Sequence, residues 1–218
     1  MIAVPHPIRR FIDDECTFLE LLIRQFPALH DEWKTKTLKE FEEQAAEVAE
    51  GDDEVRLDVY RSLANGLDAY DCTTDTFRSA MLVIAYSYYD TAVQLLCRNT
   101  KKLTPLEFLC VSKQILIEKE VQEDIDFLDN LVRPLRNHLV HNNRPDDVKK
   151  QKGQGKSRLE KVHKKRRDTI LTDDGRLVLA DDALAIETLK RAHRALSYVA
   201  SKLGYVTRYT ERNTDTAE

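Results

Sequence analysis

The sequence is poor in the residues that interrupt secondary structure. Six glycines and six prolines are spread over 218 residues, too few for the many turns of a sandwich or barrel built from short strands. Apolar residues make up 42% of the chain and charged residues 33%, which is typical of a helix-rich globular protein with its own core. The composition therefore predicts an all-α protein.

Disulfide pairs, a leader and a long apolar run are also lacking. The four cysteines are scattered and form no Cys-x-x-Cys pair, which favours free thiols in a reducing compartment over a disulfide framework or a zinc site. Residues 1–7 contain no apolar run suited to a signal peptide. The most apolar stretch, residues 80–89, is too short to cross a bilayer. We expect a cytoplasmic protein that has no membrane segment and needs no metal or cofactor.

Charge is distributed unevenly along the chain. The net charge is −4, yet residues 144–167 hold eleven Lys or Arg against Asp146, Asp147 and Glu160, a local balance of +8. The remaining residues therefore sum to −12. An acidic body with one basic segment indicates an anionic partner that meets this segment, although a solvated, flexible loop has the same composition.

Apolar residues recur at helical spacing through most of the chain. This spacing predicts helices over residues 7–25, 31–50, 54–67, 74–98, 104–120, 122–142 and 181–203. Pro27 is expected to end the first of them. Asp174-Gly175 stands between two apolar runs, which predicts a small hairpin over residues 169–179. The polar end, residues 206–218, is expected to be a disordered tail.

The predicted helix over residues 122–142 has two contrasting faces. On a wheel of 100° per residue, one quadrant holds an apolar stripe of Leu128, Leu131, Val132, Leu135 and Leu139. Arg136, Asn137 and His141 fall on the opposite side, which is expected to face water, a partner or a substrate.

An arginine, an amide and a histidine on one face suit phosphodiester chemistry. A guanidinium can hold a phosphate through paired hydrogen bonds, and an imidazole can move a proton near neutral pH. RNA is the substrate that suits, because its 2′-OH is a built-in nucleophile. Most helices with one Arg and one His are nevertheless solvated surfaces.

The segment FLDNLVRPLRNHLVHNN, residues 127–143, resembles the motif helix of the HEPN superfamily (higher eukaryotes and prokaryotes nucleotide-binding). Its Arg136-Asn137-x-x-x-His141 matches the family signature of Arg, a polar residue, three variable residues and His. Residues 81–96, MLVIAYSYYDTAVQLL, look like the paired core helix, with Asp90 where an acidic residue often stands. Residues 174–184, DGRLVLADDAL, resemble the approach to the last helix of many members. The resemblance covers roughly residues 74–204.

The resemblance implies an antiparallel helical bundle of HEPN type that usually dimerises. We accordingly divide the chain into an N-terminal helical extension, residues 1–70, and an HEPN-like core, residues 71–205. The core carries a basic loop insertion over residues 144–168 and the small hairpin before its last helix. The tail over residues 206–218 follows. Residues 1–70 resemble no known family.

Active members of the family are endoribonucleases found in toxin–antitoxin pairs, phage defence and RNA-targeting CRISPR effectors. By resemblance, Arg136 binds the scissile phosphate, Asn137 positions the site, and His141 acts as acid or base for attack by the 2′-OH. The implied products are a 2′,3′-cyclic phosphate and a 5′-OH, with no metal. Toxins silenced by nucleotidyltransferase antitoxins commonly carry Tyr two residues after the His, where this chain has Asn143.

Several further residues are assigned a place in this hypothesis. His138, near the edge of the site face, is either an auxiliary catalytic group or partly buried at an interface. The residues expected to bind RNA are Arg133, Lys164, Lys165, Arg166 and Arg167. Expected partners are RNA, a second copy of the chain, and an antitoxin or defence-system protein. One alternative is a non-catalytic module that binds RNA, a nucleotide or a protein; another is a regulatory subunit that acts through residues 1–70.

Overall fold

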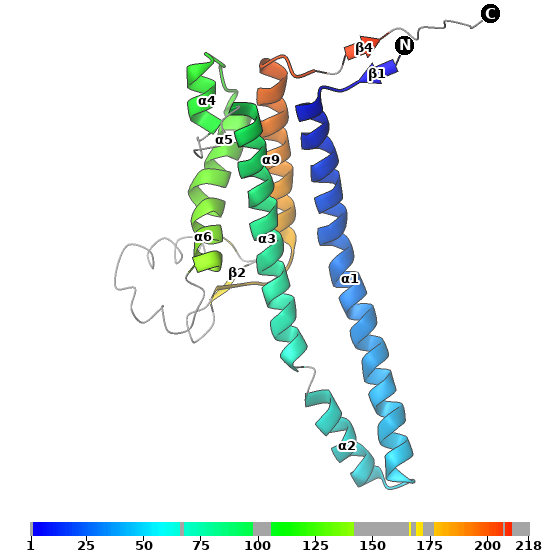
Figure 1. The fold of residues 1–218 in the computed structure, drawn as a ribbon. Helices are drawn as coiled ribbons and strands as arrows, with labels where there is room; N and C mark the ends of the chain where they lie inside the picture. Colours follow the sequence, from blue (N-terminus) through cyan, green and yellow to red (C-terminus); the bar gives the residue numbers. More distant parts are fainter. Residues whose placement is uncertain are drawn as a thin grey trace, which may run out of the picture.

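The computed structural model describes residues 2–65, 68–97, 106–141, 166, 169–171, 177–206 and 208–210. Most of these residues are helical, which confirms the prediction of an all-α protein. Short antiparallel strand pairs accompany the helices at the two ends of the bundle (Figure 1).

The first helix, α1, is a single helix over Pro7–Ala49. The break predicted at Pro27 is wrong, because Pro27 lies inside α1. A proline within a helix removes one backbone hydrogen bond and clashes with the carbonyl four residues earlier, at a cost of about 3 kcal/mol. Packing of the turn before Pro27 offsets this cost. Ile23 is fully buried in the core, and Phe26 stacks on Phe77 of the neighbouring helix.

A turn that contains glycine separates α1 from α2 (Asp53–Asn65). Glu50 and Gly51 adopt φ values of 47° and 98°, a region that glycine enters without steric cost. The carboxylate of Asp52 then caps α2 by accepting a hydrogen bond from the backbone N–H of Glu54 at 2.9 Å. The predicted break between these helices is therefore confirmed.

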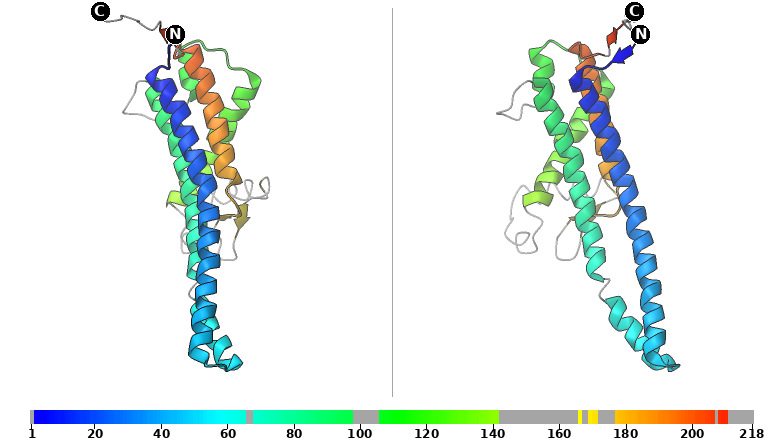
Figure 2. Two further views of the ribbon diagram at one scale, coloured as in Figure 1. Left: turned by 90° about the vertical axis from the view of Figure 1, so that its right-hand side faces the viewer. Right: turned by 45° about the vertical axis from the view of Figure 1, so that its right-hand side comes forward.

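The remaining helices complete a bundle around the first half of α1. They are α3 (Asp68–Cys97), α4 (Leu106–Ser112), α5 (Lys119–Phe127), α6 (Arg133–His141) and α9 (Ala183–Lys202). α3 packs against α1, α6 and α9, and α9 also packs against α1 and α5. α1 and α6 run in one direction, whereas α3 and α9 run in the other (Figure 1). The far end of α1 extends with α2 well beyond the other helices (Figure 2).

The helix predicted over residues 104–120 is interrupted. α4 ends at Ser112, and α5 begins only at Lys119. Gln114 adopts a φ of 54°, and the N–H of Ile115 bonds to the carbonyl of Cys110 at 2.8 Å. A left-handed residue followed by a bond back across five residues is the Schellman termination of a helix, so the chain turns here before α5.

Two strand pairs lie at the edges of the bundle. β2 (Thr169–Leu171) pairs antiparallel with β3 (Leu177–Leu179), with Thr169 opposite Leu179. Residues 172–176, which include the predicted Asp-Gly turn, lie outside the described residues. The pairing places β3 immediately before α9.

The other pair joins the two ends of the described chain. β1 (Ile2–Val4) pairs antiparallel with β4 (Arg208–Thr210), as Figure 2 shows above the bundle. We expected disorder from residue 206 onwards, yet residues 208–210 form a strand because β1 offers them backbone partners. Residues 211–218 lie outside the described part of the chain.

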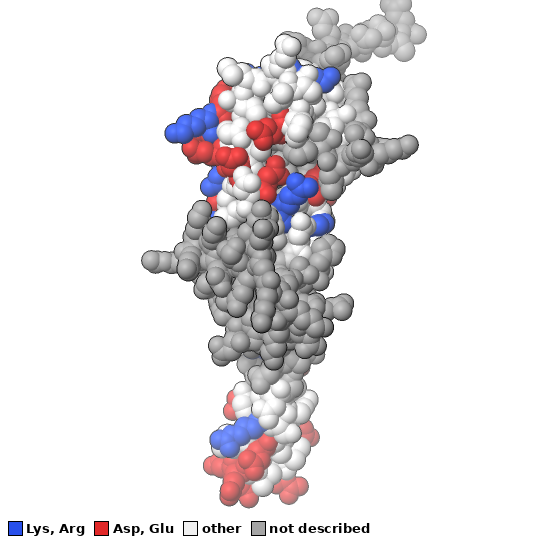
Figure 3. Space-filling model, turned by 90° about the vertical axis from the view of Figure 1, so that its left-hand side faces the viewer, with Lys and Arg blue, Asp and Glu red and all other residues white. Residues whose placement is uncertain are grey.

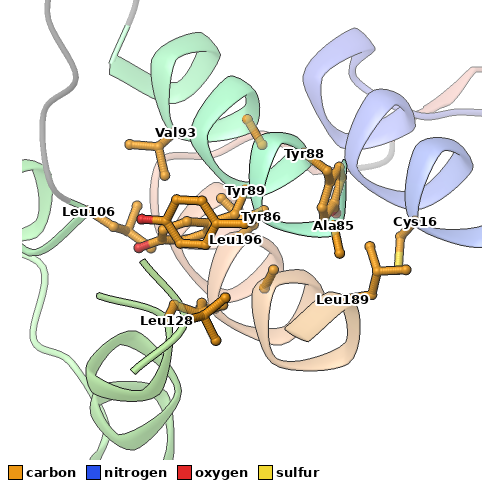
Figure 4. Packing of buried hydrophobic residues seen from close by; sticks show 14 of the residues in the cluster. Cys16, Ala85, Tyr86, Tyr88, Tyr89, Val93, Leu106, Leu128, Leu189 and Leu196 are labelled. Carbon is orange, nitrogen blue, oxygen red and sulfur yellow. The ribbon is translucent and has the colours of Figure 1, made fainter. Parts of the chain in front are cut away.

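The core lies where α3 meets α9 and α1. Tyr86 and Tyr89 extend from α3 towards Leu106 and Leu128, whereas Tyr88 points towards α1 (Figure 4). The Tyr88 hydroxyl donates a hydrogen bond to the carbonyl of Ile12 at 2.8 Å. About one turn of α3 therefore packs against two different neighbours.

One stretch of α3, Thr76–Cys97, is long and apolar enough to span a membrane by length and composition alone. Half of its apolar window is buried inside the bundle. The neighbours α1, α6 and α9 cover that half, so core packing accounts for its composition.

The motif helix belongs to one continuous rod with a wide turn. α5 passes into the π-helical turn η1 (Leu128–Val132) and then into α6, and the N–H of Arg133 bonds to the carbonyl of Leu128. Pro134 follows at once. It lacks an N–H and would clash with a carbonyl of a regular α-helix, and the extra residue in the turn relieves that clash. The wide turn also changes the phase of every later residue.

A buried ion-pair network fastens this rod to α9. The carboxylate of Asp124, only 3% exposed, accepts a hydrogen bond from Arg191 Nη1 at 3.0 Å. It accepts two more from Arg194, from Nε at 2.9 Å and from Nη2 at 2.8 Å. Arg191 also bonds to Glu187 and lies over the ring of Phe127. One carboxylate on α5 thus holds two guanidiniums of α9.

The Asp124→Asn substitution tests this network. It should lower the free energy of unfolding by about 2 kcal/mol, because two guanidiniums then face a neutral amide. Urea denaturation at pH 7 measures the change. Glu123→Gln is the matched control, since Glu123 is exposed and pairs with Lys119 on the same helix. That control should change stability by less than about 0.5 kcal/mol. Equal losses in both variants would show that the network does not hold α5 to α9.

Candidate functional site

Two of the predicted catalytic residues are neighbours on α6. Nη1 of Arg136 donates a hydrogen bond to Oδ1 of Asn137 at 3.0 Å. Asn137 is exposed, whereas Arg136 is partly buried, and its Nε has no hydrogen-bond partner among the described residues. His141 is the last residue of α6, one turn beyond Asn137, and its side chain lies outside the described residues.

Carboxylates of α3 and η1 lie beside the guanidiniums of α6. Burial raises the pKa of Asp90, and the nearby Arg133 and Arg136 act against this rise. Burial also raises the pKa of Asp129, again against the effect of Arg133. Two carboxylates and two guanidiniums therefore share a partly buried space where α3 packs on α6.

This arrangement corrects the helical-wheel placement of Arg133 and Arg136. On a regular wheel Arg133, like Arg136, falls opposite the apolar stripe, on the face expected to meet water, but both are partly buried and close to Asp90. A regular wheel does not account for the extra residue in the π-helical turn η1, nor for the packing of α3 against α6. Asn137 is exposed as the wheel predicts, and Val140 is exposed as well. Arg133, predicted to bind RNA, has carboxylate neighbours within the protein.

Tyrosine hydroxyls close the inner side of this space. The Tyr86 hydroxyl donates a long hydrogen bond of 3.4 Å to Oδ1 of Asp129. Burial raises the pKa of Tyr86, so the hydroxyl stays protonated at neutral pH and can act only as a hydrogen-bond partner. The Tyr89 hydroxyl is buried without a partner among the described residues. Figure 4 shows both hydroxyls on the side of α3 that faces Leu106 and Leu128.

His138 is buried rather than open to a substrate. Its exposed fraction is 6%, and its Nε2 has no hydrogen-bond partner in the described part of the chain. Burial lowers the pKa of this imidazole. A neutral, enclosed ring is typical of a packing residue, so the geometry favours partial burial over an auxiliary catalytic role for His138.

Most of the predicted RNA-binding segment lies outside the described residues, including Lys164, Lys165 and Arg167. Arg166 is described: it pairs with Glu187 of α9 and lies over the ring of Phe127. Figure 3 shows the side of the molecule on which α4, α5 and α6 lie. Positive and negative side chains are mixed over the bundle there, and acidic side chains gather at the α1–α2 end. The described surface on this side is therefore not a single basic patch.

Of the carboxylates beside the motif helix, only Asp90 was singled out from the sequence. Asp90 had a detectable signal, because it is an acidic residue inside the most apolar helix of the chain. Asp129 and Arg133 stand four residues apart, the spacing of an ion pair on a helix. The partners of Asp124 on α9 could not have been identified, since they are 67 and 70 residues away in sequence.

Comparisons with known proteins identify no relative. No protein-family model matches the chain, and neither a curated protein nor a solved structure is similar to it. Within the described ranges, no group of three or more His, Cys, Asp or Glu could hold a metal ion.

The burial of His138 predicts how stability depends on pH. Because the folded pKa is lowered, the unfolded chain takes up a proton near its ordinary pKa of about 6.5 while the folded chain does not. The wild type should therefore lose stability at this site as the pH falls from 7.5 to 5. In His138→Gln that loss is absent, so the stability cost of the substitution should shrink at pH 5. Urea denaturation at both pH values measures it; an equal cost would contradict the burial of a neutral ring.

Proposed function

We propose that the chain is an endoribonuclease of HEPN type that cleaves RNA without a metal ion. The proposal rests on the Arg136-Asn137-x-x-x-His141 motif, which lies at the end of a helix packed in a bundle of alternating direction. In this proposal α3, the α5–α6 rod and α9 form the HEPN-type core. α1 and α2 are an extension whose first half packs onto that core.

The proposed reaction uses the 2′-OH of RNA as the nucleophile. The 2′ oxygen bonds to phosphorus while the bond from phosphorus to the 5′ oxygen breaks. One imidazole takes the proton of the 2′-OH, and an acid returns a proton to the leaving 5′ oxygen. The products are a 2′,3′-cyclic phosphate and a 5′-OH. His141 supplies the imidazole, and Arg136 offsets the charge that grows on the phosphate.

Neighbouring groups support this role for Arg136. Asn137 accepts a hydrogen bond from one end of the guanidinium. The Asp90 carboxylate is close enough for the charge of Arg136 to act against the rise of its pKa. The hydrogen bond to Asn137 restricts the side chain before a phosphate arrives, which lowers the entropy cost of binding. Because Asn137 is exposed, the end of the Arg136 guanidinium that bonds to it lies next to solvent.

RNA is drawn to the site by the basic segment over residues 144–167 in this proposal. Contacts of lysines and arginines with phosphates are largely blind to sequence and weaken with salt. An antitoxin or defence-system protein is the proposed regulator. If the chain binds RNA without cleaving it, it is instead a non-catalytic binding module.

Alanine substitutions at the motif test the proposal. Arg136→Ala and His141→Ala should each reduce RNA cleavage by about a hundredfold or more, because each removes a group that acts on the transition state. Cleavage of labelled RNA by the purified protein, with and without EDTA, measures the effect. EDTA should leave the wild-type rate unchanged.

Arg10→Ala is the matched control for these variants. Arg10 lies on α1 with its side chain 72% exposed and pairs with Asp14, so its loss removes a positive charge far from the motif in sequence. The Arg10→Ala variant should cleave RNA at the wild-type rate. A motif variant that cleaves as fast as Arg10→Ala would show that the proposed site is wrong.

The proposed active form is a homodimer with its two motif helices facing each other. One helix supplies one Arg and one His, whereas the reaction needs an acid and a base on opposite sides of the phosphate. Val140 is an apolar side chain with 46% of its surface exposed, beside the exposed Asn137. A two-fold axis through this face brings together two sets of the motif, and isologous pairing is the commonest symmetry.

Val140→Glu should abolish the dimer and RNA cleavage together, because two like charges then meet near the axis. Light scattering and the cleavage assay measure the two properties. Val206→Glu is a matched control, since Val206 is 48% exposed and lies beyond α9. A fully active wild-type monomer, or a Val140→Glu dimer that cleaves normally, would contradict the dimer model.

A further inference from the structure

A groove of about 650 Å³ lies between α1 and the first half of α9. Its floor is partly apolar, with Ile23 and Pro27 from α1. Four basic side chains line it against two carboxylates, although the whole chain has a net charge of −4. The basic side chains are Arg24, Lys190, Arg191 and Arg194. A concave surface of this size with convergent polar groups is typical of a binding site.

Two of these cations are held in place from behind. Asp124 is almost fully buried and fixes Arg191 and Arg194 through three hydrogen bonds. Arg194 uses Nε and Nη2 for this, and its side chain is still 60% exposed. The bonds therefore position the guanidinium and leave its remaining edge to solvent. An anion that binds there meets a donor whose orientation is already set.

The other two cations share a single carboxylate. Glu20 lies 2.7 Å from Nη2 of Arg24 and 3.9 Å from Nζ of Lys190. The side chains of Arg24 and Lys190 are 54% and 53% exposed. Glu20 offsets one of these two positive charges, and the exposed ends of Arg24 and Lys190 remain available to an anion.

The basic segment ends beside this groove. Arg166 pairs with Glu187, which lines the groove, and it shares the ring of Phe127 with Arg191. The other end of the segment follows His141 at the end of α6. The most basic part of the chain therefore connects the motif helix to the groove.

We propose that the groove between α1 and α9 binds the phosphate backbone of single-stranded RNA. The inference rests on the proposed function, because it takes RNA as the ligand, and it adds a binding surface separate from the motif. Contacts to phosphates do not depend on base identity. They weaken at high salt, because the release of counterions from the RNA is then less favourable.

The double substitution Arg24→Gln and Lys190→Gln tests the groove in the full-length protein. His141→Ala serves as the background so that the RNA stays intact. The probe is a fluorescein-labelled single-stranded RNA of about 20 nucleotides, and affinity is measured by anisotropy between 50 and 300 mM salt. Removing two phosphate contacts should weaken binding about tenfold at low salt and flatten its salt dependence.

The matched control is Arg10→Gln with Lys119→Gln. Arg10 and Lys119 are more exposed than the groove cations, and each pairs with an acidic residue four positions along its own helix. The control removes the same total charge and should bind within about twofold of the background. Circular dichroism confirms that both double variants keep their helices.

The outcomes separate this inference from the proposed function. Weaker binding in the groove variant than in the control supports the groove, whether or not the wild type cleaves RNA. Equal binding in the two variants, with RNA cleavage by the wild type, overturns the groove alone. Failure of the wild type to bind the RNA at low salt overturns both proposals.

Discussion

Burial of the apolar stripe on the α5–η1–α6 rod is the constraint on which the candidate site depends. Leu128, Val132 and Leu135 have no exposed surface, and each contributes about 1.5–3 kcal/mol by leaving water. The rod cannot rotate without exposing them. The orientation of the rod therefore determines where the motif lies: Arg136 is partly buried beside α3, and Asn137 is at the surface.

The wide turn before Pro134 is the second element of that constraint. It keeps one rod continuous through a residue that would otherwise break it, and it joins α5 to α6, which carries the motif. Asp124 fastens the first half to α9. Asp90 lies beside the second half. The first half of the rod is thus fixed by ion pairs as well as by apolar packing, and the second half has a carboxylate of α3 beside its guanidiniums.

The helical class and the last helix were predicted from the sequence, because apolar periodicity is a local signal and so is a glycine directly after a helix, here Gly204 with a φ of 80°. The prediction failed at Pro27 and between α4 and α5, where the outcome depends on distant packing or on one left-handed residue. At the site, the exposure of Asn137 followed from the wheel. The partial burial of Arg136 did not, because it depends on α3 and on the phase change in η1. Ion pairs between residues far apart in sequence have no local signal at all.

The most direct test of the account is cleavage of an RNA in which one known cleavage site carries a 2′-deoxy sugar. Attack by the 2′-OH predicts that the wild type cuts the RNA at its other sites, in the presence of EDTA, and leaves the substituted position intact. The new ends should be 2′,3′-cyclic phosphates and 5′-OH groups. Cleavage at the 2′-deoxy position, or no cleavage of the unmodified RNA, would contradict the account.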